Sequence, residues 1–145
     1  MTNLNPDHKE GSLTALIVED HAAVRDGMRE CIQTYFPGLR LLEARCGEEA
    51  LALAAAERPH IVLMDIGLPG IDGIETTRSL RTRAPDCYVV MVSGYEHEQF
   101  RKAAATAGAA AFIAKRNVPG DLVRLLDELV PRIARTSCSR DGIPA

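Results

Sequence analysis

Paired cysteines, long apolar runs and clusters of basic residues are all missing from this chain of 145 residues. Its four cysteines share no regular spacing and form no CxxC pair, which argues against a zinc site or a disulfide framework. No stretch is apolar over the length that a membrane-spanning helix needs, and the polar start lacks the apolar core of a secretory signal. We therefore expect a cytoplasmic protein with reduced thiols and no membrane contact.

Excess charge of one sign is also lacking. The formal net charge is -3, and lysine and arginine are scattered along the chain rather than clustered. Binding to the phosphate backbone of a nucleic acid needs a concentrated positive surface. This segment is therefore not expected to bind DNA or RNA directly.

What the chain does contain is a regular alternation of five short apolar segments with five segments of helical pattern. The apolar segments have the length of buried strands and cover residues 13–18, 39–44, 61–64, 88–92 and 110–114. The helical segments follow in turn, from a cap at Asp20 to the break at Pro37, then over residues 47–57, 72–83, 96–107 and 119–131. Asp72 and Glu75 have the spacing of a capping box, which explains Asp72 without a chemical role. Pro131 is expected to end or bend the last helix.

Strict alternation of strand and helix predicts right-handed crossovers and a parallel sheet covered on both faces. The expected fold is α/β, a flavodoxin-like (βα)5 doubly wound sheet with strand order 2-1-3-4-5 in a single domain. This domain is expected over residues 13–134, between a flexible N-terminal tail over residues 1–12 and a C-terminal tail over residues 135–145.

Polar residues follow directly after four of the five expected strands. They are Glu19 and Asp20 after the first, Asp65 after the third, Ser93 after the fourth and Lys115 after the fifth. The carboxyl ends of parallel strands share one edge of the sheet, and ligands bind at that edge. The expected order places Asp65 beside the acidic pair, so these residues should meet in one pocket.

Three carboxylates at one edge repel one another unless a cation lies among them. Oxygen donors, with no histidine or cysteine nearby at ligand spacing, favour Mg²⁺ over zinc, with Mn²⁺ as an alternative. The expected ligands are Glu19, Asp20, Asp65 and the backbone carbonyl of Gly67.

With its charge neutralised, Asp65 can act as a carboxylate nucleophile toward a phosphoryl group, and it needs no separate base. Lys115 supplies a mobile positive charge and Ser93 a hydroxyl donor for phosphoryl oxygens. Positioning and charge neutralisation are what phosphoryl transfer requires. The pocket therefore favours phosphoryl chemistry.

Four motifs carry a resemblance to a known family. They are Ile-Val-Glu-Asp-His at 17–21, Leu-Met-Asp-Ile-Gly-Leu-Pro-Gly-Ile-Asp-Gly at 63–73, Val-Ser-Gly at 92–94 and Phe-Ile-Ala-Lys at 112–115. Together they resemble the receiver domain of two-component response regulators, nearly end to end. The first two are most similar to NarL/FixJ-type regulators, which usually carry a helix-turn-helix output domain. Both a stand-alone receiver and the N-terminal part of a transcriptional regulator remain open.

The resemblance implies that Asp65 accepts a phosphoryl group, with Mg²⁺, from a sensor histidine kinase or a phosphotransfer protein. The acyl phosphate is then hydrolysed, and the altered surface binds a downstream protein target; a homodimer is a further expected partner. The chain would be a phosphoacceptor with self-catalysed phosphotransfer and autodephosphorylation, and not a conventional enzyme.

The resemblance also assigns roles to individual residues. The phosphoryl group would be bound by Ser93, Gly94 and Lys115. Ser93 and Phe112 match the switch pair of the family, in which the hydroxyl turns to the phosphoryl group and the ring moves inward. Gly67 and Tyr95 occupy positions that influence how fast the phosphoryl group is hydrolysed.

Three positions depart from the family pattern. Glu19 stands where aspartate is commoner, and its longer side chain favours metal contact through water. Arg116 follows Lys115 where many receivers have proline, so a cis peptide bond is not expected there. Phe112 has no hydroxyl, so an inward ring would be stabilised by packing alone.

Two other functions stay open. One is a receiver-like interaction module that phosphorylation does not control, although Asp65, Lys115 and the acidic pair are all retained. The other is a phosphohydrolase of the haloacid-dehalogenase type, which also forms an aspartyl phosphate. Such enzymes place the nucleophile after the first strand with an acid two residues on, whereas Asp65 follows the third strand and precedes Gly67 by two.

Overall fold

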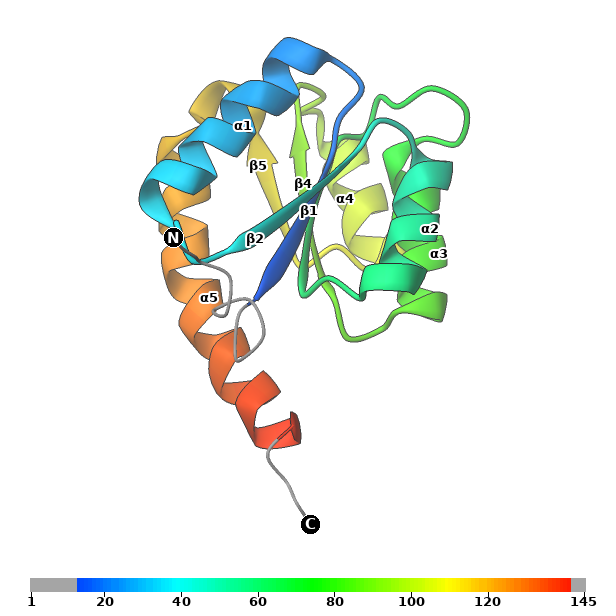
Figure 1. The fold of residues 1–145 in the computed structure, drawn as a ribbon. Helices are drawn as coiled ribbons and strands as arrows, with labels where there is room; N and C mark the ends of the chain where they lie inside the picture. The colour runs from blue at the N-terminus through cyan, green and yellow to red at the C-terminus, as the bar shows by residue number, and fades with distance from the viewer. Residues whose placement is uncertain (1–12, 142–145) are drawn as a thin grey trace.

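The computed structural model describes residues 13–141 of the chain, as five strands that alternate with five α-helices (Figure 1). The strands are β1 (Thr14–Val18), β2 (Arg40–Ala44), β3 (Ile61–Met64), β4 (Tyr88–Ser93) and β5 (Ala111–Ala114). The helices are α1 (Ala22–Tyr35), α2 (Gly47–Glu57), α3 (Gly73–Arg83), α4 (Glu98–Ala107) and α5 (Gly120–Asp141), with a short 3-10 helix, η2 (Lys115–Asn117), before the last. The tail expected over residues 1–12 and the last residues of the tail expected over 135–145 lie outside the described part.

All neighbouring strands are parallel, in the order β2-β1-β3-β4-β5. This confirms the predicted doubly wound sheet, with its switch point between β1 and β3. In the register of that pair, Val18 lies beside Met64. The residues that follow, Glu19 and Asp65, therefore leave the sheet next to each other.

Helices cover both faces of the sheet, α1 and α5 on one and α2, α3 and α4 on the other (Figure 1). Alternate residues of β1 supply the two cores: Ile17 packs with α1 and α5, whereas Leu16 and Val18 pack with α2 and α4. Every residue of β1 and β3 is buried, as continuous apolar runs in a parallel sheet predict. None of the described helices combines the length and the apolar character that crossing a membrane would take.

Of the two helix caps predicted from the sequence, the one at Asp72 is confirmed and the one at Asp20 is wrong. Asp72 caps α3, because its Oδ1 accepts a hydrogen bond of 2.9 Å from the backbone N–H of Glu75. Asp20 does not cap α1, for which the N-cap residue is His21. The longer side chain of Glu19 reaches the backbone N–H of His21 instead, at 3.1 Å.

The last helix does not end at Pro131 but continues to Asp141 and extends past the end of the sheet (Figure 1). Pro131 is exposed, so water can solvate the carbonyl whose hydrogen bond the proline ring removes. The helix thus enters the segment expected as a C-terminal tail. Among the described residues the cis peptide bond is Val118–Pro119, so the bond after Lys115 is trans, as expected.

Candidate functional site

The carboxyl edge of the sheet brings an ammonium group between two carboxylates. Lys115 Nζ lies 2.9 Å from Glu19 Oε1 and 3.4 Å from Asp65 Oδ2. The first contact is short, but its geometry does not make a hydrogen bond, so Lys115 and Glu19 form an ion pair. Residues that follow β1, β3 and β5 thus meet in one pocket, as the sequence predicted.

This pocket is well shielded from water. Glu19 is 0% exposed and Asp65 is 5% exposed, while the side chain of Lys115 retains 26%. Buried carboxylates are costly unless they are paired, and one lysine pairs with both. Removing Lys115 would leave both carboxylates without this partner in a shielded site.

The environment shifts the pKa values of two members of the trio. Burial, reinforced by the charge of Glu19, raises the pKa of Asp65, while Lys115 and a hydrogen bond from the backbone of Gly67 act against the shift. Burial lowers the pKa of Lys115, but its close contact with Glu19 and the charge of Asp65 outweigh burial and raise that pKa. The lysine therefore remains a cation beside Asp65 at neutral pH.

Both carboxylate oxygens of Glu19 have partners, and the contact with His21 was not predicted from the sequence. Its Oε2 accepts from the backbone N–H of His21 and lies 3.1 Å from His21 Nδ1. The side chain of His21 is 68% exposed, yet its Nδ1 also lies 3.4 Å from Asp20 Oδ1. The Glu-Asp-His sequence at a helix start was the available signal for this contact.

Asp20 offers a buried oxygen without a hydrogen bond, as Glu19 does at Oε1 beside Lys115. Its Oδ1 is buried and accepts no hydrogen bond from the described part of the chain. Donor atoms of Glu19, Asp20 and His21 lie within 4.8 Å of one another, a group of which Asp65 is not a member. A buried carboxylate oxygen without a hydrogen bond, beside further carboxylates, fits a hard divalent cation such as Mg²⁺.

The loop after β4 carries the residues expected to bind phosphate and to tune its hydrolysis. Ser93 is fully buried, and its Oγ accepts a hydrogen bond of 2.9 Å from the backbone N–H of Tyr95. Gly94 is exposed, and Tyr95 is 50% exposed. The Tyr95 ring lies against Gly67, because a Cβ added at Gly67 would lie 3.0 Å from Tyr95 Cε2. The two residues expected to influence hydrolysis are therefore in contact.

Phe112, the other expected switch residue, is half-buried on β5. The guanidinium carbon of Arg101, on α4, lies 4.4 Å from the centre of its ring. This cation-π contact joins α4 to β5.

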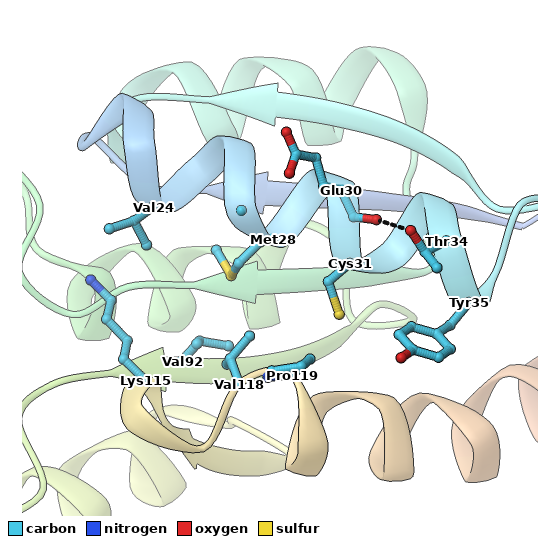
Figure 2. A pocket seen from close by; sticks show the side chains of 11 residues that line it. Val24, Met28, Glu30, Cys31, Thr34, Tyr35, Val92, Lys115, Val118 and Pro119 are labelled. Carbon is cyan, nitrogen blue, oxygen red and sulfur yellow. Dashed lines mark hydrogen bonds between the residues drawn. The ribbon is translucent and has the colours of Figure 1, made fainter.

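An apolar cavity of about 520 Å³ lies between α1 and the loop that leads into α5 (Figure 2). Val24, Met28 and Cys31 line it from α1, and Val118 and Pro119 line it from the opposite side. Lys115 lies at one end of the cavity, and it is also the residue that pairs with Glu19 and Asp65.

A doubly wound parallel sheet with acidic residues and a lysine at its carboxyl edge is typical of receiver-type signalling domains. The family model for the response regulator receiver domain matches residues 15–127, and this chain belongs to that family. Receiver domains of this family act in two-component signalling and generally bind Mg²⁺.

Relatives and solved structures agree with this membership. The chain is 40% identical over 104 residues to the transcriptional activator protein ExaE of Pseudomonas putida, covering 72% of this chain and 49% of that protein. It is 39% identical over 104 residues to the response regulator GacA of Pseudomonas aeruginosa, covering 71% and 48%. The chain thus spans about half the length of the curated relatives it matches.

Two crystal structures show the same domain. A CheY-like receiver domain protein from Methanospirillum hungatei matches with a TM-score of 0.79 and 28% identity, over 86% of this chain and 98% of that one. A LuxR-family two-component response regulator from Aurantimonas matches with a TM-score of 0.77 and 31% identity, over 83% and 86%. The predicted family and fold are confirmed, and the predicted signalling function is confirmed at the level of the family.

Proposed function

We propose that Asp65 accepts a phosphoryl group from the phosphohistidine of a sensor histidine kinase or a phosphotransfer protein. The observation that supports this most strongly is the placement of Lys115 Nζ between the carboxylates of Glu19 and Asp65 in a shielded pocket. A buried nucleophile beside a fixed cation is suited to attack on a phosphoryl group.

The transfer balances with the groups at hand. An oxygen of the Asp65 carboxylate forms a bond to phosphorus as the bond from phosphorus to the donor imidazole nitrogen breaks, and that nitrogen keeps the electron pair. Lys115 lies within reach of a phosphoryl oxygen and offsets its charge. Hydrolysis later returns Asp65 as a carboxylate and releases inorganic phosphate.

Asp20, Asp65 and the Gly67 carbonyl are the groups proposed to hold Mg²⁺ directly, with Mn²⁺ as a substitute. When bound, the cation would neutralise charge on the carboxylates and on the phosphoryl oxygens. Glu19 is proposed to act from the outer side through water, because its oxygens already face Lys115 and His21. The Oδ1 of Asp20, which is buried without a hydrogen bond, supports its direct role.

The signal is proposed to pass through Ser93 and Phe112. Ser93 Oγ would exchange its hydrogen bond with the Tyr95 N–H for one to the phosphoryl group. Ser93, Gly94 and Lys115 would together form the binding site for that group. The Phe112 ring would then move inward from beneath Arg101. A downstream protein or a second copy of the chain would bind the altered face of α4, β5 and α5.

The cavity beside Lys115 supports a protein as the phosphoryl donor. Its apolar walls would contact a docking surface while the pocket at its end receives the phosphoryl group. The relative ExaE is a transcriptional activator protein, but direct binding to DNA is not proposed for the described residues of this chain.

The direct test is to incubate the protein with Mg²⁺ and acetyl phosphate and to measure its intact mass. We expect the gain of one phosphoryl group in the wild type and none in the matched variant Asp65→Asn. No gain in either protein would instead favour an interaction module independent of phosphorylation. Rapid turnover of many phosphoesters would favour a phosphohydrolase.

A further inference from the structure

The backbone carbonyl of Glu19 lies at the point where the chain leaves the sheet. The N–H of Glu19 still donates to the carbonyl of Ala44, the last residue of β2, at 3.0 Å. The carbonyl of Glu19 accepts from Arg25 Nη1 of α1, at 2.8 Å. A side chain thus satisfies this carbonyl where β1 has ended.

Arg25 is itself fixed from the opposite side by Glu43 on β2. Arg25 Nε donates to Glu43 Oε1 at 3.1 Å, and the arginine side chain is only 14% exposed. Glu43 is paired in register with Ile17, whose side chain packs on the sheet face that α1 covers. The glutamate therefore points toward α1, and one guanidinium joins β2, the connection after β1, and the first turn of α1.

We propose that Arg25 is a positioning residue for the metal site. It fixes the backbone that carries Glu19 and Asp20, because its planar group of N–H donors can bind a carbonyl and a carboxylate at once. This inference rests on the proposed function, in which the acidic pair holds Mg²⁺. Groups that orient metal ligands in this way commonly change metal affinity by about ten-fold or more.

The charge of Arg25 and its position have opposite effects on metal binding. A nearby positive charge repels Mg²⁺, so loss of the charge alone would tighten binding. Loss of the positioning contact would weaken binding. The sign of the change therefore separates the two roles.

Arg29 provides a matched control one helical turn later. Its Nη1 contacts Glu43 Oε2 at 3.1 Å and Asp26 Oδ1 at 2.9 Å. Arg29→Gln removes a positive charge from the same glutamate and leaves the contact between Arg25 and Glu19 in place.

The experiment is a calorimetric titration of Mg²⁺ alone into the metal-free protein. We expect the dissociation constant to rise about ten-fold in Arg25→Gln and to stay unchanged or fall in Arg29→Gln. Arg25→Lys should recover part of the affinity, because its single ammonium can reach only one of the two partners well. Wild-type affinity in Arg25→Gln, or an equal loss in both glutamine variants, would overturn the proposal.

Glu43→Gln gives a second route to the same answer if circular dichroism shows that Arg25→Gln does not fold. This variant keeps Arg25 but weakens its anchor, so we expect a smaller rise in the Mg²⁺ dissociation constant, and an unchanged constant would overturn the positioning role. Failure of the wild type to bind Mg²⁺ would contradict the proposed function itself. Binding by the wild type with no loss in the variants would contradict only the role of Arg25.

Discussion

Lys115 forms its closer ion pair with Glu19 and not with Asp65. The distance from Nζ is 2.9 Å to Glu19 Oε1 and 3.4 Å to Asp65 Oδ2. Glu19 is also the more deeply buried of the two carboxylates. Its main role in this structure is therefore to hold the lysine, while Asp65 keeps the weaker contact and is the freer to react.

This arrangement predicts unequal roles for the two acidic residues after β1. Asp20→Asn should weaken Mg²⁺ binding more than Glu19→Gln, because Asp20 Oδ1 is buried without a hydrogen bond while Glu19 already has partners. Titration calorimetry of each variant with Mg²⁺ measures the difference. Equal losses would contradict the outer role of Glu19.

Stability without metal should depend on the ionisation of Asp65. Burial and the charge of Glu19 raise the pKa of Asp65 above its ordinary value of 3.8. The native state therefore holds this proton more tightly than the unfolded state, and stability is lost as pH rises from the ordinary pKa through the raised one. Above both values the full penalty persists.

Asp65→Asn removes that penalty and leaves Lys115 paired with Glu19. We expect a higher free energy of unfolding than wild type at pH 7, with the difference shrinking as pH falls toward 3.8. Urea denaturation in EDTA across this range measures it. An asparagine variant that is less stable at pH 7 would show that the attraction to Lys115 outweighs burial.

The fold was predictable because local features agree along the whole chain. Apolar runs such as 61–64 fix the buried strands, polar and turn residues end them, and strict alternation leaves few possible topologies. The meeting of Glu19, Asp65 and Lys115 followed from strand order alone. Strand ends in a parallel sheet are adjacent whatever their side chains do.

Contacts that depend on side-chain direction were not predictable in the same way. The link from Arg25 to Glu43 joins residues 18 positions apart, and no local pattern selects that pair. His21 is exposed, but its Nδ1 turns back to Glu19. The passage of α5 through Pro131 depends on solvent exposure that the sequence does not show.

Replacement of a glycine by alanine should raise stability at Gly27 and lower it at Gly73. Gly27 lies on the exposed side of α1, and an added Cβ would meet nothing within 4 Å, so Gly27→Ala should stabilise the protein by up to about 1 kcal/mol through helix propensity. A Cβ at Gly73 would lie 2.0 Å from the carbonyl oxygen of Asp65. Gly73→Ala should therefore destabilise the fold and displace Asp65.

Urea denaturation of the two variants measures the free energy of unfolding of each against the wild type. Acetyl phosphate labelling should also slow in Gly73→Ala and stay unchanged in Gly27→Ala, because only Gly73 touches the backbone of Asp65. Equal stability of the two variants would mean that α3 can move away from Asp65 at little cost.

The contact between Tyr95 and Gly67 predicts a change in the lifetime of the acyl phosphate. The ring lies over Gly67, two residues after Asp65, and would shield that side of the phosphoryl group from water. Tyr95→Ala should therefore shorten the lifetime severalfold, whereas Tyr95→Phe, which keeps the ring, should stay close to wild type. Intact mass followed over time after removal of acetyl phosphate measures the decay. Loss of the ring without faster decay would mean that water reaches phosphorus from another side, and a change in the phenylalanine variant would assign the effect to the hydroxyl.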